Sequence, residues 1–201
     1  MILAFDGSSV DGSAYTDVVD LADRSPGWLD DMVSAWSTYG LAVFAVLMAV
    51  AWWRARRVSA TAAVIALAVP LVVVAGYGVD AALKLVAREA RPCQSLHVAT
   101  LEACPAPGDW SFPSNHAAIA AAAAVALWFV SRRLGAVAAV AACAMAVSRV
   151  WVGAHYPHDV AAGVVVGALV AVGPMAALRR HPDSPAGWIT GTRLRPLLAA
   201  S

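Results

Sequence analysis

Long uncharged apolar stretches constrain this chain more than any other feature of its sequence. The first, residues 32–53, holds 22 residues without a charge, and a second stretch of the same length covers residues 58–79. A helix needs about 20 apolar residues to cross the roughly 30 Å hydrocarbon core of a bilayer. Three further stretches, 112–131, 134–147 and 160–178, repeat the pattern. The sequence therefore predicts an integral membrane protein with an all-α fold, a polytopic transmembrane helical bundle of about five to six spans.

The composition agrees with this prediction and excludes other classes of protein. Of the 201 residues, 61% are hydrophobic and only 13% are charged, whereas a soluble domain is about 25% charged. A disordered chain is excluded by the same figures. With so few charges no broad basic face is available for nucleic acid, so we expect no nucleic-acid partner. Membrane lipids are the expected surroundings.

The distribution of charge divides the chain into three regions. Residues 1–31 hold seven Asp and a single Arg, and their apolar residues fit a short interfacial helix. Residues 32–178 hold all five expected spans, and within this region the loop 80–112 is rich in charged residues and proline. Residues 179–201 form a basic tail that we expect in the cytoplasm.

Arginine residues predict the orientation of the spans. Three segments that alternating spans bring to one side, 54–57, 132–133 and 179–195, carry nine Arg. The positive-inside rule assigns that side to the cytoplasm. The N-terminus and the segments 80–112 and 148–159 are then expected on the extracytoplasmic face of the plasma membrane. The segments 80–112 and 148–159 nevertheless carry four cations, which indicates a local function: Lys84, Arg88, Arg91 and Arg149.

Two groups of polar residues are expected to meet at this outer face. Lys84, the only lysine in the chain, precedes Arg91 by seven positions, and a lysine point charge with an arginine fork suits a phosphate clamp. Alternatively, Lys84 is a snorkelling side chain at the end of a span. Ser114, Asn115 and His116 follow a proline at the start of the third stretch, where the free N–H groups of a helix start bind anions. A capped membrane helix with an interfacial histidine is the alternative interpretation.

A third group contains Arg149, His155 and Asp159. Arg149 follows the uncharged fourth stretch, so it lies near the membrane edge, where an ionisable group indicates function. A carboxylate at position 159 would hold the tautomer and orientation of His155; a charged loop with an aspartate at a helix start is the simpler alternative. His158 is expected to be a bystander. Cations and histidines with few carboxylates argue against a divalent metal site, so no metal and no cofactor is expected.

Together the three groups resemble the three-part signature of the type 2 phosphatidic acid phosphatase superfamily, which includes acid phosphatases and vanadium-dependent haloperoxidases. The resemblance covers residues 80–159 and implies the helical core of that superfamily. Asn115 departs from it, because the family has glycine there; the extra side chain would narrow the phosphate site or the substrate range. The matching motifs are Lys84-x6-Arg91-Pro92, Pro113-Ser114-Asn115-His116 and Ser148-Arg149-x5-His155-x3-Asp159.

The resemblance implies a role for each matched residue. His155 would attack the terminal phosphorus and become phosphorylated, and Asp159 would orient it. His116 would protonate the leaving group and then activate the water that breaks the phosphohistidine. The implied enzyme is a phosphoric ester or anhydride hydrolase that requires no metal. The phosphoryl oxygens would be held by Lys84, Arg91, Ser114, Asn115 and Arg149.

A second, weaker similarity points to one group of enzymes within this superfamily. Residues 20–30 and the stretch 155–160 resemble the short bacterial undecaprenyl-diphosphatases linked to bacitracin resistance. This implies removal of one phosphate from undecaprenyl or another polyprenyl diphosphate, which recycles the carrier lipid for peptidoglycan synthesis in the cell wall. Three alternatives stay open. They are a phosphatase for phosphatidylglycerol phosphate, phosphatidic acid or diacylglycerol diphosphate, a vanadate-using haloperoxidase, and a non-enzymatic carrier or scaffold for polyprenyl phosphate.

The three cysteines differ in their setting. Cys93 and Cys104 share the outer loop, where a disulfide would persist and would fix Arg91 beside the phosphate. Two unpaired thiols in a mobile lid are the alternative. Cys143 lies in the fourth apolar stretch and is expected to be a buried free thiol.

Overall fold

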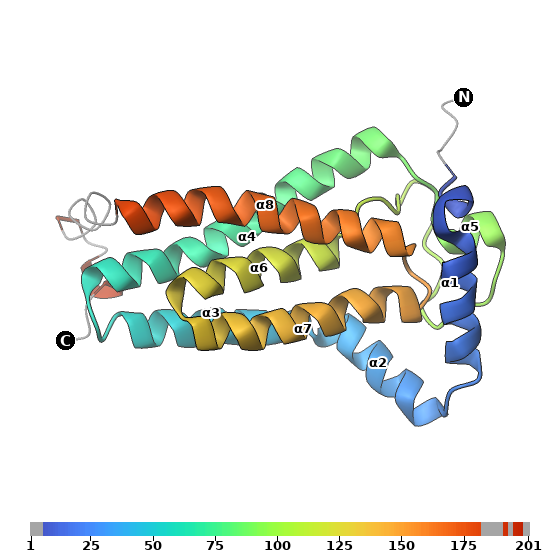
Figure 1. Ribbon diagram of the computed structural model, residues 1–201, viewed down its shortest axis with the longest axis horizontal. Coiled ribbons are helices and arrows are strands. Elements are labelled where there is room, and N and C mark those ends of the chain that lie inside the picture. Colours follow the sequence, from blue (N-terminus) through green and yellow to red (C-terminus); the bar gives the residue numbers. More distant parts are fainter. Residues whose placement is uncertain (1–5, 182–190, 193–194, 199–201) are drawn as a thin grey trace.

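The computed structural model describes residues 6–181, 191–192 and 195–198, and every regular element in these ranges is helical. The long helices run side by side along the long axis, and the first helix lies across one end of them (Figure 1). The predicted all-α bundle is therefore confirmed. The elements are α1 (Ser8–Asp23), α2 (Gly27–Tyr39), α3 (Leu41–Ala55), α4 (Ala60–Ala87), α5 (Pro92–Leu96), α6 (Asn115–Val130), α7 (Arg132–Trp151), α8 (Pro157–Arg180) and the short 3-10 helix η1 (Arg195–Leu197).

The helices differ in how well they fit a bilayer. Three of them, α4, α7 and α8, are long and apolar enough to cross a membrane by themselves. Helices α2 and α3 pass the same test as a pair, with a bend of 51° between them. Helix α6 is apolar but shorter, at 16 residues. The five expected spans fall on these five helical units, but only three of the described helices, or four with the bent pair, are long and apolar enough to cross a membrane.

The first expected span, 32–53, is two helices rather than one. They meet at Gly40, where a Cβ atom would lie 2.5 Å from the carbonyl oxygen of Trp36 and 2.8 Å from Cε of Met145 in α7. The backbone carbonyl of Trp36 cannot move away as a flexible side chain can, so the bend requires a residue without a side chain at position 40. Uncharged residues continue through Gly40 on both sides, so the absence of charge alone predicts a single straight span.

Two other boundaries also differ from expectation. Helix α4 continues to Ala87, so residues 80–87 of the expected loop are helical, and Asp80 and Lys84 lie on the buried face of that helix. Helix α6 starts at Asn115, because the preceding Ser114 has an extended backbone. A charged residue on a buried face interrupts the hydropathy pattern without interrupting the helix.

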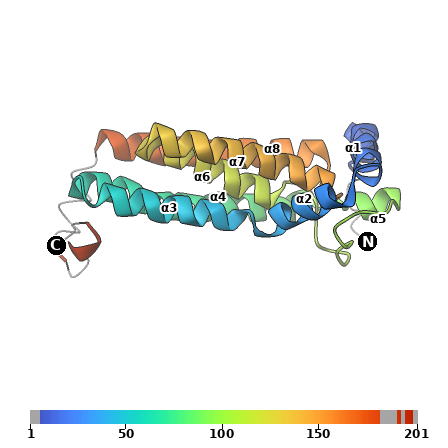
Figure 2. The same ribbon diagram turned by 90° about the horizontal axis from the view of Figure 1, so that it is seen from below.

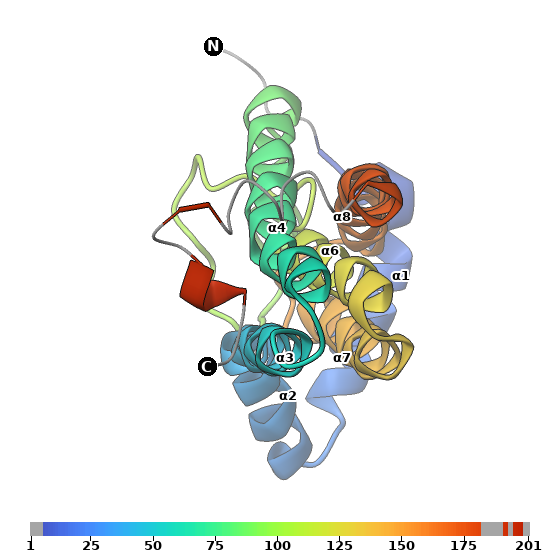
Figure 3. The same cartoon turned by 90° about the vertical axis from the view of Figure 1, so that its left-hand side faces the viewer.

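Helix α6 is the centre of the bundle and packs against α4, α7 and α8 (Figure 3). Small residues let membrane helices approach one another closely. In α8, a Cβ atom at Gly167 would lie 2.1 Å from the carbonyl oxygen of Ala118, and one at Gly163 would lie 2.5 Å from that of Ser114. These contacts hold the starts of α6 and α8 together. The buried face of α6 consists of Ala117, Ala118, Ala120, Ala121, Ala122, Ala123, Ala124, Ala126 and Leu127.

Helix α1 covers the end of the bundle at which α7 ends and α8 begins (Figure 2). Tyr15 and Val19 on α1 are buried in one cluster with Tyr156. The hydroxyl of Tyr15 also donates a hydrogen bond of 2.9 Å to the carbonyl of Gly153. The short helix expected within residues 1–31 is therefore present and packs on the protein, while its position at a membrane interface stays a prediction.

Candidate active site

A polar cavity of about 310 Å³ lies among the ends of α4, α6, α7 and α8. Six of the eight residues predicted from the sequence line it, and the other two, Ser114 and Asp159, are fully buried. The three sequence groups are thus brought together in space. The lining consists of Tyr77, Lys84, Arg91, Glu102, Pro105, Asp109, Asn115, His116, Ile119, Arg149 and His155.

The turn between α7 and α8 positions His155 and Asp159. Helix α8 begins at Pro157, and the carboxylate of Asp159 accepts the backbone N–H of Tyr156 at 2.9 Å, as in a capping box. The same oxygen, Oδ2, lies 3.4 Å from Nδ1 of His155. Only 2% of His155 and none of Asp159 is exposed. The helix cap therefore also fixes the carboxylate that faces the imidazole.

Ser111 joins this pair and was missed by the sequence analysis. Its hydroxyl donates a hydrogen bond of 2.5 Å to Oδ2 of Asp159 and lies 3.4 Å from Nδ1 of His155. Its side chain is fully buried. Ser111 stands three positions before Ser114 in the chain, and this closeness to the second motif is the only signal that could have found it.

The surroundings of His155 favour a neutral imidazole. Nε2 lies 3.1 Å from Nη1 of Arg91, and a guanidinium only donates, so we assign the imidazole proton to Nδ1, which faces Asp159. Burial lowers the pKa of His155 well below its usual value of 6.5, and the positive charges of Arg91 and Lys84 lower it further. The unprotonated Nε2 of a neutral imidazole is a competent nucleophile.

Lys84 and Arg91 reach the cavity from the end of α4. The Nζ atom of Lys84 donates to the carbonyl of Trp110 at 2.8 Å. The Nη1 atom of Arg91 donates to the carbonyl of Ala154 at 3.0 Å. Only 8% of Lys84 and 7% of Arg91 is exposed. Backbone carbonyls therefore fix both cations in the cavity wall without neutralising their charge.

Two carboxylates of the outer loop pair with the arginines of the cavity. Glu102 contacts Arg149 twice, with Oε2 at 2.8 Å from Nη1 and Oε1 at 3.1 Å from Nη2. Asp109 contacts Arg91, with Oδ1 at 2.9 Å from Nη2. The sequence analysis did not find either carboxylate, because an acidic residue in a proline-rich loop looks like any solvated loop residue.

Helix α2 contributes a further contact that was not predicted. Nη1 of Arg149 donates a hydrogen bond of 2.5 Å to the hydroxyl of Ser37, which is 1% exposed. Ser37 is in the first half of the bent pair, and the bend at Gly40 follows it. A straight first span was the expectation, so this contact could not be foreseen.

The start of α6 brings polar atoms without partners to the cavity. The backbone N–H of Ser114 donates to the carbonyl of Asp159 at 3.0 Å, which joins the starts of α6 and α8. The hydroxyl of Ser114 and Oδ1 of Asn115 are buried without a hydrogen-bond partner in the part of the chain that the structure describes. With His116 in the cavity wall beside them, this helix start is suited to receive an anion.

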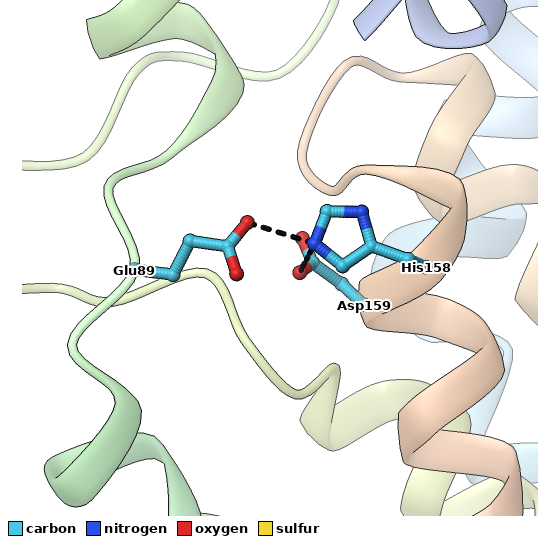
Figure 4. A group of neighbouring side chains, drawn as sticks. All are labelled: Glu89, His158 and Asp159. Carbon is cyan, nitrogen blue, oxygen red and sulfur yellow. Dashed lines mark hydrogen bonds and ion pairs between the residues drawn. The ribbon is translucent and has the colours of Figure 1, made fainter. Parts of the chain in front are cut away.

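His158 lies in a partly buried hydrogen-bonded cluster, while its being a bystander to the chemistry stays a prediction. Its Nδ1 is 2.7 Å from Oδ1 of Asp11 on α1, and its Nε2 is 3.0 Å from Oε1 of Glu89. Figure 4 shows Nε2 also facing Asp159, whose Oδ1 is 3.4 Å away. His158 thus connects α1 and the end of α4 to the carboxylate beside His155.

This cluster also holds the group of side chains that could bind a metal ion. The ligand atoms of Glu89, His158 and Asp159 all lie within 4.8 Å of one another. Hydrogen bonds from His158 to Asp11 and Glu89 account for the arrangement. The cluster lies behind Asp159, and Glu89 and His158 do not line the cavity.

Comparison with known proteins places the chain in a family. The family model described as the PAP2 superfamily matches residues 65–182. The chain belongs to the PAP2 superfamily. It is 30% identical over 142 residues to "Undecaprenyl-diphosphatase BcrC" of Bacillus subtilis (strain 168), which is 71% of each chain. It is also 39% identical to "Bacitracin transport permease protein BcrC" of Bacillus licheniformis over 64 residues, 32% of each chain.

A solved structure has the same PAP2 fold. It is titled "Crystal structure of the first transmembrane PAP2 type phosphatidylglycerolphosphate phosphatase from Bacillus subtilis". The TM-score is 0.62 with 21% sequence identity, over 87% of this chain and 86% of the other. Membership of the PAP2 superfamily, together with the apolar helices, makes this protein a membrane phosphatase.

The loop that covers the cavity of this PAP2 protein is closed by a disulfide. Cys93 and Cys104 are bonded, with their Cα atoms 5.9 Å apart, which confirms the expected bridge. The bridge ties α5, directly after Arg91, to the loop that carries Glu102. Cys143 is a free thiol as expected, but it is exposed on the outer face of α7 rather than buried. A hydropathy pattern alone does not tell which face of a membrane helix meets lipid.

Proposed function

We propose that this PAP2 protein removes the terminal phosphate of undecaprenyl or another polyprenyl diphosphate through a phosphohistidine at His155. The observation that carries the proposal is a buried, neutral His155 whose Nε2 is 3.1 Å from Arg91 and whose Nδ1 faces Asp159. The choice of lipid is supported by the 30% identity to a protein named undecaprenyl-diphosphatase. Removal of this phosphate would return the carrier lipid to peptidoglycan synthesis.

In the first step Nε2 of His155 forms a bond to the terminal phosphorus, and the bond from that phosphorus to the bridging oxygen breaks. His116 gives its proton to the bridging oxygen, so the polyprenyl monophosphate leaves. The imidazolium that forms keeps its Nδ1 proton and is stabilised by the carboxylate of Asp159. Positioning and charge stabilisation dominate phosphoryl transfer. The phosphoryl oxygens would be held by Lys84, Arg91, Arg149, Ser114 and the helix start at Asn115.

In the second step a water molecule attacks the phosphorus of the phosphohistidine. His116, now neutral, takes a proton from the water, and the N–P bond breaks with its electron pair returning to Nε2 of His155. Inorganic phosphate leaves, and both histidines are restored. Apart from the substrate and one water molecule, each step uses only groups of this chain.

We infer that the cavity faces the extracytoplasmic side, with the N-terminus on that side as well. Three arginine-bearing segments, 54–57, 132–133 and 179–180, lie at the ends of α3, α6 and α8 that are remote from α1 and the cavity (Figure 1). The positive-inside rule assigns that end to the cytoplasm. Labelling of single-cysteine variants in intact cells tests this, and labelling from the cytoplasmic side alone at position 8 would contradict it.

Phosphatidylglycerol phosphate is the second candidate substrate. The PAP2 protein with the same fold is titled a phosphatidylglycerolphosphate phosphatase. Both lipids end in a phosphate carrying about −1.5 to −2 charges, which the cationic cavity suits equally. The two differ in their tails.

Phosphate release by the purified full chain in detergent tests the proposal. The panel contains undecaprenyl diphosphate, phosphatidylglycerol phosphate, phosphatidic acid and diacylglycerol diphosphate, all in excess EDTA. We expect the fastest release from undecaprenyl diphosphate, unaffected by the chelator. Faster release from a glycerolipid would transfer the assignment to that lipid, and binding of polyprenyl phosphate without any release would favour a carrier.

A trapping experiment tests the intermediate separately. Substrate labelled in the terminal phosphate is mixed with the protein and quenched in alkali, where phosphohistidine survives. We expect label on the wild-type chain and none on His155→Ala. The matched control is His97→Ala, since His97 is an exposed histidine of the outer loop.

A further inference from the structure

The carboxylates on the cavity arginines occupy places that a phosphate would need. We propose that Glu102 and Asp109 compete with the substrate phosphate for the arginines of the cavity. This competition weakens the binding of every anion, so that lipids with a terminal phosphate still bind and phosphodiester lipids, which carry a single charge, do not. The inference rests on the proposed function, because it takes the cavity as the site of the substrate phosphate.

Glu102 makes the contact that a phosphate would replace. Its two oxygens lie 2.8 and 3.1 Å from Nη1 and Nη2 of Arg149. Two parallel contacts to a guanidinium are also the way in which arginine binds phosphate. The side chain of Arg149 is 5% exposed, whereas that of Glu102 is 42% exposed. The arginine is therefore fixed in the wall, and the carboxylate can turn out into water.

The backbone of Glu102 holds this competitor close to the site. Its N–H donates to the carbonyl of Val152 at 3.0 Å, and its carbonyl accepts from the hydroxyl of Thr100 at 2.7 Å. The disulfide at Cys104 closes the same loop. A displaced carboxylate thus stays within reach of Arg149, and its effective concentration is high.

Asp109 forms a second, weaker contact of the same kind. Its Oδ1 is 2.9 Å from Nη2 of Arg91, and its side chain is 52% exposed. Arg91 also donates to the carbonyls of Asp109 at 3.2 Å and Ala154 at 3.0 Å. Those two contacts would keep the guanidinium beside His155 after the carboxylate has left. Glu102 is therefore the main competitor.

Competition of this kind acts as a threshold. If the site is open for only a fraction of the time, every anion binds more weakly by that fraction. A terminal phosphate carries about −1.5 to −2 charges and still gains by replacing a carboxylate. A phosphodiester headgroup carries a single charge, so it gains little by replacing one. The carboxylates would thereby keep the site clear of the phospholipids that fill the surrounding bilayer.

The experiment compares the full chain in detergent with Glu102→Gln, using inorganic phosphate and dimethyl phosphate as probes in isothermal titration. We expect phosphate to bind Glu102→Gln about tenfold more tightly, which corresponds to an open fraction of about a tenth in the wild type. We also expect dimethyl phosphate to bind measurably only to the variant. Asp109→Asn should show the same change with a smaller size.

Asp17→Asn is the matched control, because Asp17 is an exposed carboxylate on α1 outside the cavity. Phosphate affinity equal to or weaker than wild type in Glu102→Gln would overturn the proposal, and so would an equal gain in the control. If the variant folds less stably, the rise in melting temperature that phosphate produces gives the same comparison. These measurements need no turnover. The competition by Glu102 can therefore be disproved while the phosphatase function stands, and the phosphatase function can be disproved while the competition stands.

Discussion

The helix ends and the outer cover of the cavity contribute side chains of two different kinds. The ends of α4, α6, α7 and α8 supply buried groups, of which Lys84 and Arg91 are held by backbone carbonyls. The cover, which consists of α1, α5 and residues 97–110, supplies Glu102 and Asp109, which are about half exposed and make ion pairs. Buried groups keep one geometry, and exposed groups can exchange with solvent or ligand. The helix ends are therefore expected to supply the chemistry and the cations that hold a phosphate, while the cover adjusts how tightly an anion binds.

The strongest test of this division is His155→Ala at the helix ends. We expect turnover to fall about a thousandfold or more, because the nucleophile is lost. The dissociation constant for phosphate should change far less, since the cations remain. Single-turnover kinetics and titration measure the two effects. Retention of more than roughly a tenth of the wild-type rate would exclude a phosphohistidine.

Asp159→Asn should also lower the rate of turnover, but by a smaller factor than His155→Ala. We expect a loss on the order of a hundredfold in kcat, because an amide orients the imidazole but does not neutralise an imidazolium. Substrate binding should persist, since Asp159 does not line the cavity. A rise in KM with unchanged kcat would show that Asp159 belongs with the binding groups instead.

The pH dependence of kcat/KM sharpens the same comparison. The pKa of His155 lies well below 6.5 because of burial and the charge of Arg91, so its protonation should limit activity only below that pH. Arg91→Gln removes a positive charge, which raises the pKa of His155, so the pH of half-maximal kcat/KM on the acidic limb should rise by about 1. Arg88→Gln is the control, because Arg88 bonds the carbonyl of Leu85 on its own helix. If the acidic limb of the profile does not move, the charge of Arg91 does not lower the pKa of His155.

In the cover, loss of the disulfide should change stability and binding more than chemistry. We expect Cys93→Ser with Cys104→Ser to lower the free energy of unfolding by about 2–3 kcal/mol, from the entropy of the opened loop. KM should rise a few fold, because the bridge lies next to Arg91, while kcat stays close to wild type. Cys143→Ser, on the exposed face of α7, is the control. A fall in kcat without a change in KM would show that the cover contributes to the chemical step rather than to binding.

The smallest effect is expected from the link between α1 and α8. Asp11→Asn weakens the contact of 2.7 Å to His158, but Asp159 keeps its hydrogen bonds from Ser111 and the backbone of Tyr156. We therefore expect kcat to fall only about two- to threefold, since one of several supports of the carboxylate is removed. A loss as large as that of Asp159→Asn would make α1 part of the catalytic arrangement.

The sequence predicted the residues whose type and spacing are unusual. Lys84 is the only lysine, and Arg149 and His155 border an uncharged stretch, so a functional explanation was required for each. The all-helical bundle followed from hydropathy, which marks the spans because a bilayer admits few alternatives.

Other parts of the site could not be predicted, because their residue types are ordinary in their context. Ser111 and Glu102 are a serine and a glutamate in a loop, and only the fold brings the first beside Asp159 and the second onto Arg149. The bend lies at Gly40, where a Cβ atom would meet the carbonyl oxygen of Trp36 at 2.5 Å. Contacts between distant segments leave no trace in local hydropathy.

Substitutions on the alanine face of α6 change side-chain volume in essentially one direction, toward larger side chains. A side chain of a single methyl group has almost nothing left to remove, so every substitution except one to glycine adds volume at these buried alanine positions. Added volume in a close-packed interior forces neighbours apart, and at Ala117 or Ala118 it would separate the starts of α6 and α8. The centre of the bundle is therefore the part that evolution can least vary by small steps, whereas the cover can change its charges one at a time.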